Sequence, residues 1–89
     1  MIKLIAAKSM GGRLLELRFS DGATGVYDFG PIVDTVTAMT DPLRDPDFFG
    51  RYYIELGALA WPNGLDFSAG SLYRRLQDEG KLKRDVRAA

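Results

Sequence analysis

Carboxylates and aromatic hydroxyls are the groups best suited to chemistry in this 89-residue chain, because it contains no His and no Cys. An imidazole base, a thiolate nucleophile, a disulfide framework and a zinc site of the usual ligand types are therefore ruled out. A carboxylate pair such as Asp28 and Asp66 stays open, but acids so distant in sequence are weak evidence for a shared site. The phosphate-binding, dinucleotide-binding and serine-nucleophile motifs are missing. We expect no catalytic residue, no bound cofactor and no metal ion.

One acidic segment imitates a metal-binding loop. Residues 45–50, Asp-Pro-Asp-Phe-Phe-Gly, have acids at the first and third positions of a calcium loop and Gly at the sixth. The fifth and twelfth positions are Phe49 and Leu56, so the ligand set is incomplete. Asp45 followed by Pro46 is instead typical of a cap on a short helix.

Residues 61–66, Trp-Pro-Asn-Gly-Leu-Asp, are the segment best suited to recognition. The Pro and Asn suit the centre of a type I turn with Gly at its fourth position, and Asp66 is expected to hold the loop by accepting backbone N–H bonds. Trp61 has two interpretations: a core residue under the turn, which a domain with one Trp favours, or an exposed anchor for a protein or ligand. The candidate interaction or loop residues are Trp61, Pro62, Asn63, Gly64, Asp66 and, on the following helix, Tyr73.

These residues must be positioned by one small α+β domain, because half of the chain would bury too little core to fold alone. Alternation of apolar and polar residues, as at Leu15, Leu17 and Phe19, predicts antiparallel strands at 2–8, 13–19 and 24–29. Asp21-Gly22 is expected to form a type I′ turn, with positive φ at both residues.

The rest of the chain predicts helical turns, a hairpin and a helix. A weak helix begins at Pro31, and Asp-Pro pairs at 41–42 and 45–46 each cap a single turn. Residues 51–56 and 58–61 form a hairpin, in which one of two adjacent tyrosines, 52 and 53, faces inward. The clearest helix follows Ser68 and ends before Gly80.

The predicted order is β-β-β-α-β-β-α for a two-layer domain over residues 1–80, followed by a basic, frayed tail over residues 81–89. The stripes of its strands and last helix predict one core cluster: Leu15, Leu17, Phe19, Ile54, Trp61, Leu72 and Leu76. The N-terminal strand or the hairpin over 51–61 is expected at a sheet edge, where a second copy or a partner can bind.

Several local patterns together resemble a bacterial family, the domain of unknown function 2442. The most specific is Trp-Pro-Asn-Gly-x-Asp at 61–66, followed by Leu72-Tyr73, and Ala69-Gly70 departs from the acidic helix start of the family. The other matching pieces are Phe19-Ser20-Asp21-Gly22, Asp28-Phe29 and residues 43–48. The resemblance implies a short stand-alone member with the domain order given above and no established activity.

Members of the family are often encoded beside another small protein, in an arrangement resembling toxin–antitoxin pairs. The resemblance therefore favours a non-catalytic protein-interaction or regulatory module, whose partner is another small protein or a second copy. A small-ligand sensor that uses the loop over 61–66 is the alternative, and a nucleic-acid-associated regulator is a weaker one. No stretch is long and apolar enough for a membrane span or an export signal, so we expect a cytoplasmic protein.

The charges predict weak nucleic-acid binding. Residues 1–18 carry four basic groups and one acid, and residues 67–89 carry six and three, but residues 19–66 carry two basic groups against eight acids. The acidic middle repels a polyanion, so we expect a dissociation constant no tighter than ~10⁻⁴ M at physiological salt. An anisotropy titration with DNA and RNA near 150 mM salt checks this, and sub-micromolar affinity contradicts it.

Overall fold

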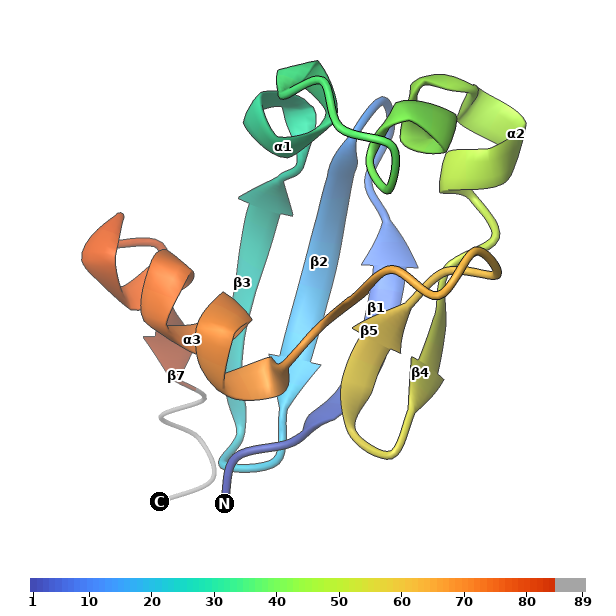
Figure 1. The fold of residues 1–89 in the computed structure, drawn as a ribbon. Coiled ribbons are helices and arrows are strands. Elements are labelled where there is room, and N and C mark those ends of the chain that lie inside the picture. Colours follow the sequence, from blue (N-terminus) through green and yellow to red (C-terminus); the bar gives the residue numbers. More distant parts are fainter. Residues whose placement is uncertain (85–89) are drawn as a thin grey trace.

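Two antiparallel sheets share one hydrophobic core in the computed structural model of this chain, which describes residues 1–84 (Figure 1). The four-stranded sheet has the order β1-β2-β3-β7, and the three-stranded sheet has the order β4-β5-β6. The strands are β1 Leu4–Ser9, β2 Leu14–Phe19, β3 Ala23–Asp28, β4 Tyr53–Glu55, β5 Ala58–Ala60, β6 Asp66–Phe67 and β7 Lys83–Arg84. The α+β class and the order of the main elements are confirmed, and β6 and β7 are additions to it.

Three short helices gather at one end of the sheets, and a longer helix lies beside β3 (Figure 1). They are α1 Gly30–Asp34, η1 Asp41–Arg44, α2 Pro46–Phe49 and α3 Ala69–Asp78. The Asp45 carboxylate accepts the Asp47 N–H, which confirms the cap on α2, and the Ser68 hydroxyl caps α3 by accepting the Ser71 N–H. Within residues 1–84, no helix has the length and apolar character that crossing a membrane requires.

Trp61 lies at the centre of the core and has no exposed surface. The indole Nε1 donates a hydrogen bond of 2.9 Å to the carbonyl oxygen of Phe49, which ties α2 to the three-stranded sheet. The rings of Phe29, Phe49 and Phe67 surround it, with centroids 5.8 to 6.0 Å away. The core interpretation of Trp61 is confirmed, and this side chain cannot serve as an exposed anchor.

The predicted core cluster is confirmed for six of its seven members, and Ile54 is the exception. Ile54 remains 37% exposed, because β4 is the edge strand of the three-stranded sheet and has a neighbour in that sheet on one side only. Its partner across the ladder, Leu59, is fully buried. The alternation of residues along this short strand therefore predicts the face on which Ile54 lies, but not that its strand is at the edge of the sheet.

The turn at Asp21-Gly22 differs from the prediction. Gly22 has a φ of 88°, but Asp21 does not have positive φ. The Gly22 N–H donates to the carbonyl oxygen of Phe19, so the loop spans three residues and ends in a left-handed glycine. A two-residue turn with positive φ at both positions occurs instead between β4 and β5, at Leu56 (51°) and Gly57 (82°).

Part of the tail from Lys81, for which fraying is predicted, pairs with the four-stranded sheet. Lys83–Arg84 forms β7 and pairs with β3, while residues 85–89 lie outside the described residues. Gly25 permits the chain to pass this close: a Cβ there would lie 3.0 Å from both the Lys81 carbonyl oxygen and the Leu76 side chain. A glycine inside a strand often marks such an approach of another backbone.

Replacing Trp61 by Ala removes the central ring and leaves a cavity, and we expect a loss of about 3–5 kcal/mol in the free energy of unfolding. Replacing it by Phe keeps a ring but leaves the Phe49 carbonyl without its indole donor, and a smaller loss of about 1–3 kcal/mol is expected. Urea denaturation of both variants measures these values. A Trp61→Ala protein as stable as the wild type contradicts the central position of the indole.

Candidate functional site

The loop over residues 61–66 connects β5 to β6 and has the predicted type I turn. The Gly64 N–H donates to the carbonyl oxygen of Trp61 at 3.0 Å, with Pro62 and Asn63 at the centre of the turn. The Asn63 carboxamide accepts the Leu65 N–H and donates to the carbonyl oxygen of Met39. Asn63 therefore holds the loop, in the role expected for Asp66.

Asp66 is exposed, and its carboxylate accepts no hydrogen bond from residues 1–84. With Trp61 buried, the loop does not combine its predicted candidates into one surface site. A cleft does lie beside it, but its lining includes Leu65 and Phe67 and none of the polar candidates. The interpretation of the loop over 61–66 as a small-ligand sensor stays a prediction.

Tyr73 belongs to a separate cluster that joins three distant segments. Its hydroxyl donates to Asp21 Oδ2 at 2.7 Å and accepts a hydrogen bond of 2.8 Å from Arg84 Nη2. The same Arg84 nitrogen lies 3.0 Å from Asp21 Oδ2. These contacts link α3, the β2–β3 turn and β7, and the Tyr73 ring packs edge-on against Phe19. The cluster therefore holds β7, the last described strand, against α3 and the β2–β3 turn.

The cluster shifts the titration of both its partners. Partial desolvation raises the pKa of the Asp21 carboxyl, but hydrogen bonds from Tyr73 and the Ala23 N–H, together with the Arg84 guanidinium, outweigh it and lower the pKa. The hydrogen bond to Asp21 raises the pKa of the Tyr73 hydroxyl, and desolvation and the Asp21 charge raise it further by smaller amounts. The positive charge of Arg84 lowers this pKa but does not outweigh the other causes. Both shifts favour the ionised carboxylate and the neutral phenol in the folded protein.

The edge strands of the two sheets, β1 and β4, meet, and each carries exposed apolar side chains. β1 and β4 lie next to each other, and the Leu4 N–H donates to the carbonyl oxygen of Gly57 at 2.9 Å. The prediction that the N-terminal strand or the hairpin over 51–61 lies at a sheet edge is confirmed, because β1 and β4 are both edge strands. We define the seam surface by its exposed apolar residues on these strands and their turn, which are Ile5, Tyr53, Ile54 and Leu56. Tyr52, as predicted for one of the two tyrosines, faces the core.

Leu56 is the residue of the seam surface that sequence reasoning missed. Its side chain is 94% exposed, and its φ of 51° is the only positive value of a non-glycine residue in the described chain. The sequence predicts strands over 51–56 and 58–61 with Gly57 between them, but the turn begins one residue earlier and is the two-residue loop Leu56-Gly57. Such a loop needs positive φ at both positions and normally carries Asn, Asp or Gly at the first.

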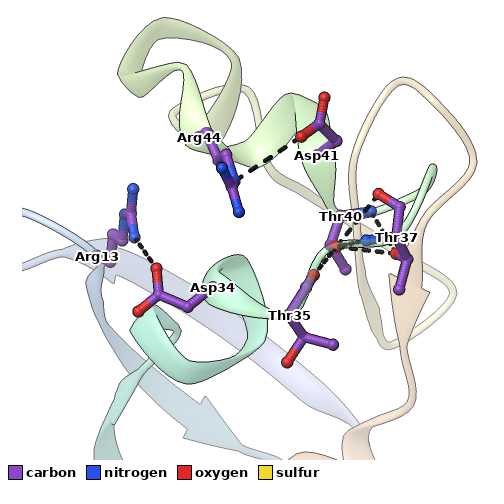
Figure 2. Close-up of polar contacts among 7 residues, drawn as sticks. All are labelled: Arg13, Asp34, Thr35, Thr37, Thr40, Asp41 and Arg44. Atoms are coloured by element: carbon purple, nitrogen blue, oxygen red, sulfur yellow. Dashed lines mark hydrogen bonds and ion pairs between the residues drawn. The ribbon is translucent and has the colours of Figure 1, made fainter.

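The loop over residues 35–40 is ordered by its own hydroxyls (Figure 2). Thr40 Oγ1 donates to the carbonyl oxygen of Thr35 at 2.6 Å and lies 2.8 Å from Thr37 Oγ1. Nearby, Arg13 pairs with Asp34, and Arg44 pairs with Asp41. Asp41 therefore forms a surface ion pair rather than the predicted cap, and the threonines fix one wall of the cleft described above.

Basic residues from both terminal segments reach the outer face of the four-stranded sheet. Arg18 lies opposite Thr24, which lies opposite Lys83, and Lys8 lies opposite Glu16. Glu16 thus offsets part of the charge on this face. The face gives little support to nucleic-acid recognition, since affinity grows with the number of basic groups that reach phosphates.

The comparison with protein families matches the description "Protein of unknown function (DUF2442)" to residues 9–78 of the chain. Because this match covers most of the chain, the protein belongs to that family. It includes the loop over 61–66 and Tyr73, on which the resemblance in the sequence was based. No curated protein and no solved structure matches the chain.

The Asp21 cluster predicts a stability loss in acid. The Asp21 carboxyl has a lower pKa in the folded state than the ~3.9 of an unfolded chain. The carboxylate therefore stabilises the folded protein above that pH, and this stabilisation disappears as the pH falls through the folded pKa. Asp21→Asn should therefore lower the melting temperature at pH 7, with the difference from wild type vanishing in strong acid. Asp66→Asn, at an exposed acid, is the control and should show no such difference.

Tyr73 predicts the opposite behaviour in alkali. The pKa of Tyr73 in the folded state lies above the ~10 of an unfolded tyrosine. The neutral hydroxyl therefore stabilises the folded protein below that pH, and this stabilisation is lost as the pH rises through the folded pKa. The melting-temperature difference between wild type and Tyr73→Phe should be constant from pH 6 to 9 and shrink above pH 10. A difference that grows in alkali contradicts the assignment.

Proposed function

We propose that this DUF2442 protein is a non-catalytic, cytoplasmic protein-interaction module that self-associates through its seam surface, as the antitoxin-like half of a small two-protein pair. The observation that carries the proposal is Leu56. A leucine in the left-handed region is strained by roughly 1–2 kcal/mol, and its apolar side chain extends into water. Neither the strain nor the exposure helps the isolated domain to fold. Contact with another protein explains both, because it buries the Leu56 side chain and offsets the cost of the strained backbone.

A hollow of about 290 Å³ lies directly beside Leu56. Its lining is mainly apolar and comes from the N-terminus, β5 and the start of α3, and includes Ile2, Ala58, Ala69 and Gly70. Leu56 itself forms part of the rim. A surface that carries both a protruding apolar side chain and an adjacent hollow is self-complementary, because a two-fold axis places each leucine against the hollow of the other copy.

The charges of this region also support a second copy. Glu55 immediately precedes Leu56, and Lys3 lines the hollow. In the proposed contact, Leu56 of one copy enters a hollow whose lining includes Lys3, so an acid and a base lie at the same end of the proposed interface. An interface with charges of both signs favours this pairing over one that brings like charges together. Proteins other than a second copy are alternative occupants that the test below separates.

Leu56→Asn tests the proposal because strain and recognition predict opposite effects. Asn accepts the left-handed conformation, so the variant monomer should melt a few degrees higher than the wild-type monomer at low concentration. The same variant should lose self-association in sedimentation equilibrium. Val36→Asn, at an apolar residue that is exposed outside the seam surface, is the control and should associate like wild type.

Two outcomes contradict the proposal. A wild-type chain that is still monomeric at about 1 mM lacks the affinity that even a weak specific contact provides. A Leu56→Asn variant that associates as tightly as wild type places the interface elsewhere. If the wild type is monomeric but binds a second small protein through Leu56, self-association is wrong. The protein is then still an interaction module, but its partner is another protein.

A further inference from the structure

We infer that the cleft between α1, β6 and α3 binds a small organic carboxylate with an apolar or aromatic body. The cleft has a volume of about 400 Å³, within the range of small-molecule sites. It lies on other elements than the seam surface, so this inference is independent of the proposed function. The lining, the charge and one ordered wall of the cleft favour such a ligand.

The lining is apolar over most of its extent. Tyr27 forms the part contributed by β3 and is almost fully buried, with its ring packed edge-on against Phe29 at 4.8 Å. Ile32 comes from α1, Leu65 from the loop over residues 61–66 and Phe67 from β6, all packed partly against the core. Such a surface favours a ligand with a hydrocarbon or aromatic body, since covering it removes apolar area from water.

One cation stands at this apolar cleft. Arg75 is the only charged residue of the lining, and its Nη1 donates to the Tyr27 hydroxyl at 3.2 Å. None of the ion pairs among residues 1–84 involves Arg75. A guanidinium has five N–H donors in a planar fork, and the Tyr27 bond uses one of them and orients the group. The remaining donors match the two oxygens of a carboxylate.

The wall formed by the loop over residues 35–40 is ordered by hydrogen bonds. Thr35 and Thr40 both line the cleft, and the Thr40 hydroxyl bonds to the Thr35 carbonyl oxygen and to Thr37 (Figure 2). The Thr35 hydroxyl donates to the carbonyl oxygen of Pro31 at 3.0 Å. A wall fixed in this way needs little ordering when a ligand binds, which favours affinity.

The test is a titration of the ¹⁵N-labelled chain followed by two-dimensional NMR. The proposed ligand has two parts, a carboxylate and an aromatic body, and three probes separate them. Phenylacetate carries both parts, acetate lacks the ring, and 2-phenylethanol lacks the charge. We expect saturable shifts of the Thr35, Leu65 and Arg75 amides with phenylacetate. Acetate and 2-phenylethanol should each bind at least tenfold more weakly.

Two variants assign the charge. Arg75→Gln should weaken phenylacetate binding at least tenfold, whereas Arg74→Gln, which changes an exposed neighbour on the same helix outside the lining, should leave it unchanged. The spectrum of each variant shows directly whether it is folded. No saturable shift with phenylacetate, equal binding by Arg75→Gln, or shifts centred on another surface would each overturn the inference.

A carboxylate can also come from the end of a protein chain, and one further probe distinguishes this source. The peptide Gly-Ser-Gly-Phe with a free carboxyl terminus is titrated beside phenylacetate. Equal or weaker binding of the peptide supports a small acid as the ligand. Binding of the peptide at least tenfold tighter than that of phenylacetate assigns the cleft to a chain terminus and overturns the small-molecule inference.

Discussion

The indole N–H of Trp61 imposes the constraint on which the rest of the domain depends. A small domain buries a limited fraction of its surface, so its one large indole must lie in the core, and a buried donor must then find an acceptor. The acceptor is the carbonyl oxygen of Phe49, at the end of α2. This bond fixes α2 against the three-stranded sheet, and Phe29 and Phe67 complete the packing around the ring.

The same constraint determines where recognition can occur. The segment that is most distinctive in the sequence, residues 61–66, serves mainly to bury its Trp and to turn the chain into β6 with the help of Asn63. The recognition proposed above therefore uses groups that the core does not. These groups lie on different elements: the seam surface with its strained Leu56, and the cleft whose lining includes Arg75. The first is apolar and protruding, and the second is concave and cationic.

The sequence predicts elements whose signal is repeated along the chain and misses those that depend on tertiary contacts. The alternation of β2 and the stripe of Leu72 and Leu76 on α3 each repeat a pattern that one substitution does not obscure. The strands β6 and β7 contain two residues each, too few for a pattern to be recognised. Ile54 shares the inward face of Leu59, and only the position of β4 at an edge leaves it exposed.

The candidate site was less predictable than the fold for a related reason. Arg75 is one of several basic residues in sequence, and only the assembled α1, β6 and α3 make it the charged residue of an apolar cleft. Leu56 differs, because a leucine between two strands at a two-residue turn is unusual by itself. The apolar residues before Leu56 predict a strand that ends there, whereas the structure has a turn with positive φ at this residue.

In the proposed dimer, the exposed and strained Leu56 of one copy enters the hollow of the other. An isotope-filtered NOE experiment on a mixture of labelled and unlabelled chains tests it most directly, since it detects only contacts between copies. We predict cross-peaks from the Leu56 methyl groups of one copy to Ile2 and Ala69 of the other, residues that line the hollow. A sample that is dimeric by sedimentation but lacks these cross-peaks, or shows them to other surfaces, contradicts the account.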